Sequence, residues 1–184
     1  MNNIIIHMIA IILLIIGGLN WGLVILNYNL IHEIALITHN IFEIIIYGLI
    51  CISAIYMMFK RDTYLPFLGH MAYPCNNLVS HIPNNADKSI FVKVLPNTSI
   101  VYWGSEKTNN HLKNLPDPRI AYHLYENTGI VISDENGNAE LKFRDPQQYV
   151  VPSLFGKKIL DKHIHYRYCI GNGLLSPIFT VSIK

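Results

Sequence analysis

Two long apolar runs open the sequence and limit what it can fold into. They extend from Ile4 to Leu26 and from Ile41 to Phe59, and about 20 apolar residues are enough to cross a bilayer. Both runs must be helical in lipid, because lipid offers backbone N–H and C=O groups no partners. A buried helical hairpin in a soluble protein is the alternative. A secretory signal is disfavoured, since no basic residue precedes the first run.

Charged residues are scarce and unevenly placed. The sequence of 184 residues is 51% hydrophobic and 14% charged, whereas soluble domains carry about 25% charged residues. No Lys or Arg occurs before Lys60. Lys60 and Arg61 follow the second run directly, and cytoplasmic flanks of spans carry the excess of basic residues. The sequence therefore predicts an integral membrane protein whose C-terminal part is cytoplasmic.

The most specific local feature lies within the first run. Gly18 and Gly22 form a G-x-x-x-G pair, which lets a second helix approach closely. Asn20 is costly in lipid unless it bonds to a neighbouring helix. These residues predict a helix–helix contact that holds the hairpin together or makes a homo-oligomer. The predicted anchors at the membrane interface are Trp21, Lys60 and Arg61.

A family resemblance follows from this motif. The stretch LLIIGGLNWGLV, a second helix and then RDTYLPFLG together resemble a small two-helix bacterial membrane family, domain of unknown function 378. The resemblance covers roughly residues 8 to 70. It implies a membrane hairpin at residues 1–69 and no biochemical role. The long extension beyond it departs from the family.

The extension predicts a linker at 70–88 and a soluble β domain at 89–184. Pro74, Pro83 and several Asn mark the linker as irregular. Short alternating runs predict strands at 90–94, 99–103, 120–125, 129–133, 138–143, 164–170 and 178–183. Asn136-Gly137 predicts a hairpin between two of them, because Asn-Gly tolerates the positive φ of tight turns. The expected fold is two transmembrane helices followed by an antiparallel β-sandwich.

Cysteine usage and charge narrow the class of protein further. Cys51, Cys75 and Cys169 are three in number and irregularly spaced. Such a set predicts no disulfide framework and fits a reducing compartment. The net charge of +2, with no basic cluster, predicts no nucleic-acid partner.

One pattern could bind a metal. His163 and His165 are two apart, so on a strand both side chains point to the same face. Imidazole suits iron, zinc and copper. The alternative is an ordinary surface pair on a strand.

The residues around this pair carry a second resemblance. GIVISDENGNAELKFRDPQQYVVP, DKHIHYRY and LLSPIFTV are similar to the C-terminal half of intradiol ring-cleavage dioxygenases. That resemblance spans roughly residues 128 to 182 and implies a non-haem ferric iron with two Tyr and two His ligands. Carried over, three ligands are Tyr149, His163 and His165. The candidates for the fourth ligand, all at the wrong spacing, are Tyr102, Tyr122 and Tyr125. The sequence departs from the family in two further ways: Asp161-Lys162 replaces the usual Arg-Pro, and the helical N-terminal part of those enzymes is absent.

Two functions follow from these observations. The preferred prediction is a membrane-anchored structural protein without a cofactor, bound to lipid and to a protein on the cytoplasmic face. The abundance of Ile and Asn indicates an AT-rich genome. With the fusion of two bacterial-looking modules, this favours a minor capsid or virion membrane protein of a large DNA virus, tethering a capsid shell to an internal membrane. The alternative is a membrane-tethered intradiol-type dioxygenase that holds iron.

Overall fold

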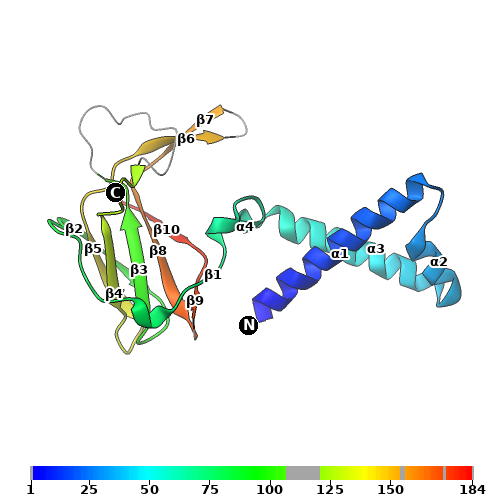
Figure 1. Ribbon diagram of the computed structural model, residues 1–184, viewed down its shortest axis with the longest axis horizontal. Coiled ribbons are helices and arrows are strands. Elements are labelled where there is room, and N and C mark those ends of the chain that lie inside the picture. Colours follow the sequence, from blue (N-terminus) through cyan, green and yellow to red (C-terminus); the bar gives the residue numbers. More distant parts are fainter. Residues whose placement is uncertain (1, 107–120, 154–155, 172, 184) are drawn as a thin grey trace. The chain divides into compact units, whose positions relative to one another are not determined.

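The computed structural model describes residues 2–106, 121–153, 156–171 and 173–183 (Figure 1). The chain divides into two compact units, Met1–Pro66 and Phe67–Lys184. The first is helical and the second is rich in β-strands, as the sequence predicts.

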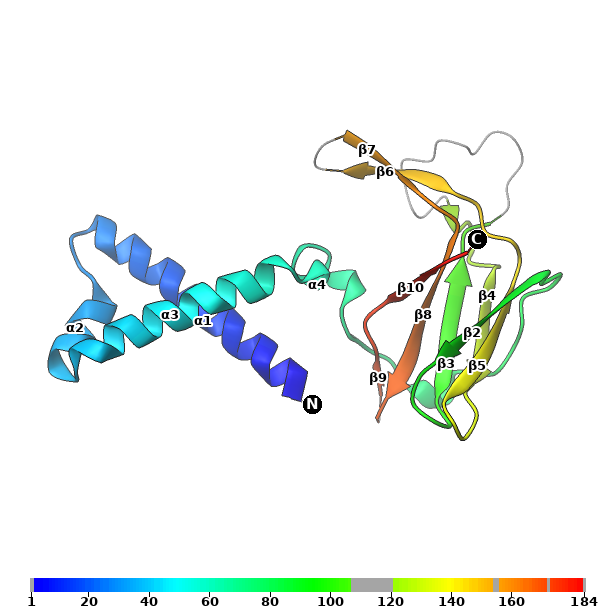
Figure 2. The same ribbon diagram turned by 180° about the vertical axis from the view of Figure 1, so that it is seen from behind.

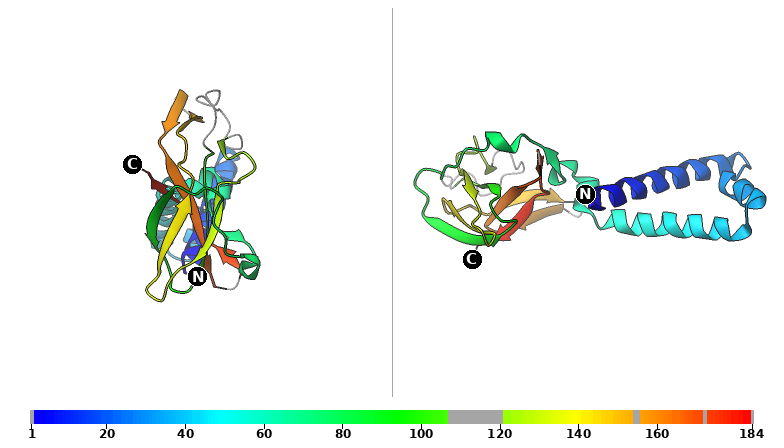
Figure 3. Two further views of the ribbon diagram at one scale, coloured as in Figure 1. Left: turned by 90° about the vertical axis from the view of Figure 1, so that its left-hand side faces the viewer. Right: turned by 90° about the horizontal axis from the view of Figure 1, so that it is seen from below.

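The helical unit is a hairpin with a short helix at its closed end. Its helices are α1 (Asn2–Ile25), α2 (Leu30–Ile37), α3 (Asn40–Met58) and α4 (Arg61–Tyr64). The long helices α1 and α3 lie side by side, and α2 lies at one end of the pair (Figure 3). Each of α2 and α3 begins at a capping side chain: Asn29 accepts from the backbone N–H of His32, and His39 from that of Ile41.

The two long helices are long and apolar enough, by length and composition, to cross a membrane, at Ile4–Ile25 and Asn40–Met58. Only 17% and 11% of the most apolar stretch of each is buried within the protein. Leu19 is 67% exposed and Ile44 is 73% exposed. Helices of a soluble core bury such side chains, so this exposure disfavours the soluble alternative.

From Pro66 onward, the described residues form two 3-10 turns and ten strands. The turns are η1 (Pro66–Leu68) and η2 (Cys75–Asn77). The strands are β1 (Met71–Ala72), β2 (Lys88–Lys93), β3 (Ser99–Gly104), β4 (Thr128–Ile132), β5 (Asn138–Phe143), β6 (Tyr149–Ser153), β7 (Gly156–Leu160), β8 (His163–Ile170), β9 (Leu174–Leu175) and β10 (Phe179–Ser182). The largest sheet has the order β1-β9-β8-β3-β4, with β10 also paired to β8, and is not closed into a barrel. β2 pairs with β5, β6 pairs with β7, and every described pairing is antiparallel.

The hydrophobic core forms where the β2–β5 pair packs against the larger sheet (Figure 2). Alternate residues of each strand point inward, because side chains in a strand alternate between its faces. The predicted inward face of β5 is confirmed: Leu141 and Phe143 are fully buried. The buried residues of this core are Val92, Ile100, Tyr102, Ala139, Leu141, Phe143 and Ile164.

The predicted hairpin at 129–143 is wrong in its pairing, although both strands and the turn are present. β4 pairs with β3, while β5 pairs with β2. The turn Asp134–Gly137 therefore connects two sheets. Gly137 has a φ of +83°, and a Cβ there would lie 2.2 Å from the Val94 carbonyl oxygen. Turn chemistry reverses the chain at such a site but does not choose the partner of each strand.

The prediction of a strand at 120–125 is also wrong for the described residues 121–125, which form a turn. The turn has a positive φ at His123 and Tyr125, +49° and +59°. The β6–β7 hairpin was not predicted from the sequence. It projects from the rest of the unit in Figures 1 and 2.

The segment expected to be a linker is attached to the sheet, so the unit begins before residue 89. β1 pairs with β9, and the backbone N–H of Tyr73 donates to the carbonyl of Gly173. The buried Arg167 guanidinium donates to three carbonyls, those of Phe67, Gly69 and Ser176. These bonds hold the start of the unit against β8.

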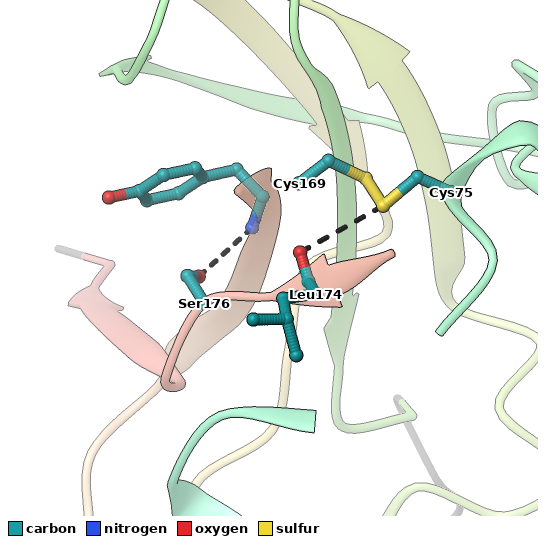
Figure 4. The surroundings of a disulfide bond; sticks show 5 residues. Cys75, Cys169, Leu174 and Ser176 are labelled. Carbon is teal, nitrogen blue, oxygen red and sulfur yellow. Dashed lines mark hydrogen bonds between the residues drawn. A yellow bond between two sulfur atoms is a disulfide. The ribbon is translucent and has the colours of Figure 1, made fainter. Parts of the chain in front are cut away.

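A disulfide joins Cys75 to Cys169, with the two Cα atoms 6.2 Å apart (Figure 4). This corrects the expectation that the cysteines are unpaired. The two residues are 94 positions apart, and the pairing of β1 with β9 brings them together. Spacing along the chain cannot reveal such a contact. Cys51, on α3, is free.

Candidate functional site

One face of β8 carries the predicted histidine pair. His163 and His165 point the same way, as expected for residues two apart on a strand. Their Nε2 atoms lie 3.1 Å apart. The opposite face of the strand contributes the fully buried Ile164 to the hydrophobic core. Strand period and core burial thus fix the direction of both imidazoles.

Hydrogen bonds orient each imidazole ring. Nδ1 of His163 contacts the carbonyl of Asp161; a carbonyl only accepts, so Nδ1 carries the proton and Nε2 presents a lone pair. The contact between the two Nε2 atoms is a hydrogen bond when His165 carries its proton on Nε2; when the proton is on Nδ1, both Nε2 atoms present lone pairs. Nδ1 of His165 lies 2.8 Å from the Thr180 hydroxyl, which either donates or accepts. In each ring Nδ1 is hydrogen-bonded, as the ring nitrogen that does not bind the metal is in metal-binding histidines.

Two tyrosines complete the cluster. The Tyr149 hydroxyl lies 3.3 Å from Nε2 of His163, and the Tyr122 hydroxyl lies 2.6 Å from that of Tyr149. Tyr149 begins β6, and Tyr122 sits in the turn before β4. Residues from three separate parts of the chain therefore bring two phenol oxygens and two imidazole nitrogens together.

Burial disfavours the charged forms of these groups. Tyr122, Tyr149 and His163 are 5%, 3% and 7% exposed. Burial is the main cause of the raised pKa of Tyr122. The charge of Tyr149 and its hydrogen bond to Tyr122 raise that pKa further. Burial raises the pKa of Tyr149 and lowers that of His163, because a charge is poorly solvated inside a protein. The neutral His163 imidazole is the form that binds metals.

The cluster fits a metal ion by its spacing and donor chemistry. Ligands about 2.1 Å from one ion at right angles lie about 3 Å apart, and the successive donor distances here are 2.6, 3.3 and 3.1 Å. Among the described residues no group of three His, Cys, Asp or Glu gathers in this way. The set is thus two phenols with two imidazoles. Phenolate is a hard anionic oxygen donor and favours a hard, oxidised metal such as ferric iron.

Of the three tyrosines that the sequence left open, Tyr122 is the one whose hydroxyl lies beside that of Tyr149. Tyr102 is fully buried in the hydrophobic core and donates to the carbonyl of Lys142. Tyr125 is half exposed and stacks on Tyr122. No local pattern of residues separates them, because the position of Tyr122 depends on how the turn at 121–127 is attached to β3. The backbone bonds Glu106 N to Ala121 O and Gly104 N to Asn127 O make that attachment.

A second polar cluster lies within the helical hairpin. Asn20 is 3% exposed; its amide donates to the Asn29 carboxamide oxygen and to the Tyr47 hydroxyl, each at 3.0 Å. Its own oxygen accepts from the backbone N–H of Ile31 at 3.1 Å. Tyr47 also donates to Asn29. One amide thereby connects α1, α2 and α3, as predicted for an Asn in an apolar helix.

The helical hairpin is the part of the chain that matches a known family. Residues 4–60 match the family described as Domain of unknown function (DUF378). The match confirms the resemblance seen in the sequence and covers the two long helices. Asn20 and its partners all lie inside the DUF378 segment.

The predicted packing glycines of the DUF378 segment face away from the hairpin. A Cβ built on Gly18 or Gly22 would meet nothing within 4 Å, whereas one on Gly17 would lie 2.9 Å from a methyl of Ile50 on α3. The close approach within the hairpin is therefore at Gly17. A homo-oligomer contact through Gly18 and Gly22 stays a prediction.

The predicted interface anchors lie at the ends of the long helices. Trp21 is 70% exposed near the end of α1. Lys60 lies just after α3. Its Nζ atom is 4.5 Å from the centre of the Tyr56 ring and also contacts Nδ1 of His7. Arg61 begins α4. Their contact with a lipid interface stays a prediction.

Replacing Asn20 by Leu is expected to destabilise the DUF378 hairpin by about 1–2 kcal/mol, the range of polar contacts between membrane helices. The change removes the acceptor of the Ile31 N–H and the amide that donates to Asn29 and Tyr47. Thermal unfolding of the detergent-purified chain, followed by helix circular dichroism, measures the loss. Ile12→Leu, at a half-exposed position of the same helix, is the control and should leave the transition unchanged; equal transitions for wild type and Asn20→Leu would contradict the role of the amide.

Two further comparisons concern the rest of the chain. The solved structure of 3-chlorocatechol 1,2-dioxygenase from Rhodococcus opacus 1CP is similar at 14% identity, over 55% of this chain and 47% of that one, with a TM-score of 0.34. The chain thus spans about half the length of that protein. A TM-score of this size is too low to support a function. Among curated proteins, none matches the sequence.

Proposed function

We propose that the second unit binds one ferric ion through Tyr122, Tyr149, His163 and His165, and that the protein is a membrane-attached dioxygenase of the intradiol type. The row of four donor atoms, with neighbours 2.6, 3.3 and 3.1 Å apart, carries the proposal. The resemblance of residues 128–182 to the intradiol dioxygenases supports the same donor set. Tyr122 supplies the ligand that the sequence left unassigned.

The residues of the chain have separate tasks in this proposal. Asp161 and Thr180 hold the two imidazoles by their Nδ1 atoms, so that both Nε2 atoms face the metal position. Tyr122 and Tyr149 would hold the ion as phenolates, with their two protons released to water, and their negative charge would offset that of the ion in a buried site. A ferric ion held there supplies Lewis acidity toward a chelating aromatic diol. Tyr125, stacked on Tyr122, keeps that ring in place.

The proposal includes a membrane anchor. The two long helices of the DUF378 segment insert in lipid, and the β-strands of the second unit form a sandwich above the bilayer. The exposure of the apolar side chains along α1 and α3 supports insertion. An enzyme tethered in this way meets substrates that partition into the membrane, and catechol-type rings with apolar substituents belong to that class. The structural role toward a viral shell stays a prediction from composition.

Iron content and colour of the purified full chain test the proposal. We expect near-stoichiometric iron and a visible absorption band from tyrosinate bound to ferric iron. Tyr122→Phe removes one phenolate ligand and should lower iron affinity by more than the ~10–100-fold that loss of an outer partner costs. The ring-opening of catechol, followed by oxygen uptake, should fall with it.

Tyr125→Phe is the matched control, because it alters a neighbouring phenol that lies outside the donor set. It should keep both the iron and the band. A folded wild-type chain that takes up no iron on reconstitution would rule out the proposal. Iron that survives in Tyr122→Phe with an unchanged band would remove Tyr122 from the site.

A further inference from the structure

The Cys75–Cys169 disulfide carries information about the compartment of the second unit. It lies beside a regular part of the sheet: the Cys169 backbone is in register with Leu175 of β9, and the Cys75 sulfur contacts the carbonyl of Leu174 (Figure 4). The pair is therefore part of the folded sheet edge. Disulfides persist in oxidising compartments, whereas the cytosol keeps thiols reduced.

The basic pair Lys60-Arg61 predicts the opposite side, but it is a weak determinant here. The positive-inside rule is set by short loops near the spans, and long domains cross the membrane largely regardless of their charge. Residues 59–184 follow α3 and contain a complete folded unit. Lys60 and Arg61 are also the only basic residues between the end of α3 and Lys88. The disulfide is therefore the stronger indicator of the side of the membrane on which the second unit lies.

An independent feature of the same unit fits an oxidising lumen. Asn97-Thr98-Ser99 is an N-x-S triplet, the acceptor sequence for N-linked oligosaccharide. Asn97 is exposed at the turn between β2 and β3, with a φ of +48°. Its backbone N–H donates to the carbonyl of Asp134 and holds the turn, while the residue itself is exposed. An exposed surface turn is where a bulky glycan is accommodated.

We propose that the second unit lies in an oxidising lumen, where the Cys75–Cys169 disulfide forms and Asn97 accepts an N-linked glycan. The hairpin loop at residues 26–39 then lies on the cytosolic side, since two spans return the chain to its starting side. The inference does not depend on the metal site.

Translation of the full chain with microsomes derived from endoplasmic reticulum tests both parts. We expect a slower-migrating band that a glycosidase removes. Asn97→Gln and Ser99→Ala should each lack it, whereas Asn136→Gln, an exposed Asn in no such triplet, should keep it. Cys75 and Cys169 should react with a thiol reagent only after reduction. Added protease should spare the β-rich unit until detergent opens the vesicles.

The outcomes of this experiment distinguish the oxidising compartment from the glycan at Asn97. Digestion of the unit in intact vesicles, with Cys75 and Cys169 reactive before reduction, would overturn the compartment and with it the glycan. A protected, oxidised unit without a glycosidase-sensitive band would overturn Asn97 as an acceptor and support the compartment. Iron binding in either case bears only on the metal site.

Discussion

Gly129→Ala is expected to destabilise the β-rich unit by about 3 kcal/mol or more, at the upper end of overpacking costs. A Cβ at this position would lie 2.1 Å from the Tyr102 hydroxyl oxygen and 2.2 Å from the ring carbon that bears it. Tyr102 cannot move aside, because it is fully buried and its hydroxyl donates to the Lys142 carbonyl at 2.7 Å. Gly129 pairs with Tyr102 across β4 and β3. Urea unfolding of the detergent-purified chain, followed by tryptophan fluorescence, measures the loss.

A double variant tests the cause of this loss. Tyr102→Leu removes the ring that the new methyl would meet, at the cost of a cavity. If the clash is the cause, Gly129→Ala should cost much less in the Tyr102→Leu background than in the wild type, so the two changes are not additive. Strict additivity of the two free energies would show that Gly129 acts through something other than Tyr102.

Loss of the Cys75–Cys169 disulfide is expected to cost about 4–5 kcal/mol, the chain-entropy value for a loop near 100 residues. The bridge spans 94 positions and so limits the unfolded chain over most of the unit. Cys75→Ser, Cys169→Ser and reduction of the wild type should each lower the urea midpoint to a similar extent. The double variant should be no worse than either single one, because one bond is lost in all cases.

Cys51→Ser is the matched control for the disulfide. Cys51 is a free thiol on α3, so its replacement should leave the midpoint and its response to reductant unchanged. A wild-type midpoint that is the same with and without reductant would show that the bond does not stabilise this unit. That result would also remove the main support for an oxidising compartment.

The sequence alone determined the features that depend on near neighbours along the chain. The length and composition of the two apolar runs predicted α1 and α3, since a long apolar run without charges is stable as a helix in lipid. The two-residue spacing of His163 and His165 predicted that both imidazoles face one way. Asn136-Gly137 predicted the turn. An Asn in an apolar helix predicted a polar partner, although not that Asn29 and Tyr47 would supply it.

Only the tertiary structure decided the features that depend on which distant segments meet. β4 and β5 flank one turn but pair with different strands, because the choice of partner depends on how the core side chains pack. Gly17, and not Gly18, faces α3, since the rotation of a helix about its axis is set by its neighbour. The Cys75–Cys169 contact and the position of Tyr122 beside Tyr149 both follow from the arrangement of the sheet. Contacts over such separations are made by burial and packing, and no local pattern of residues encodes them.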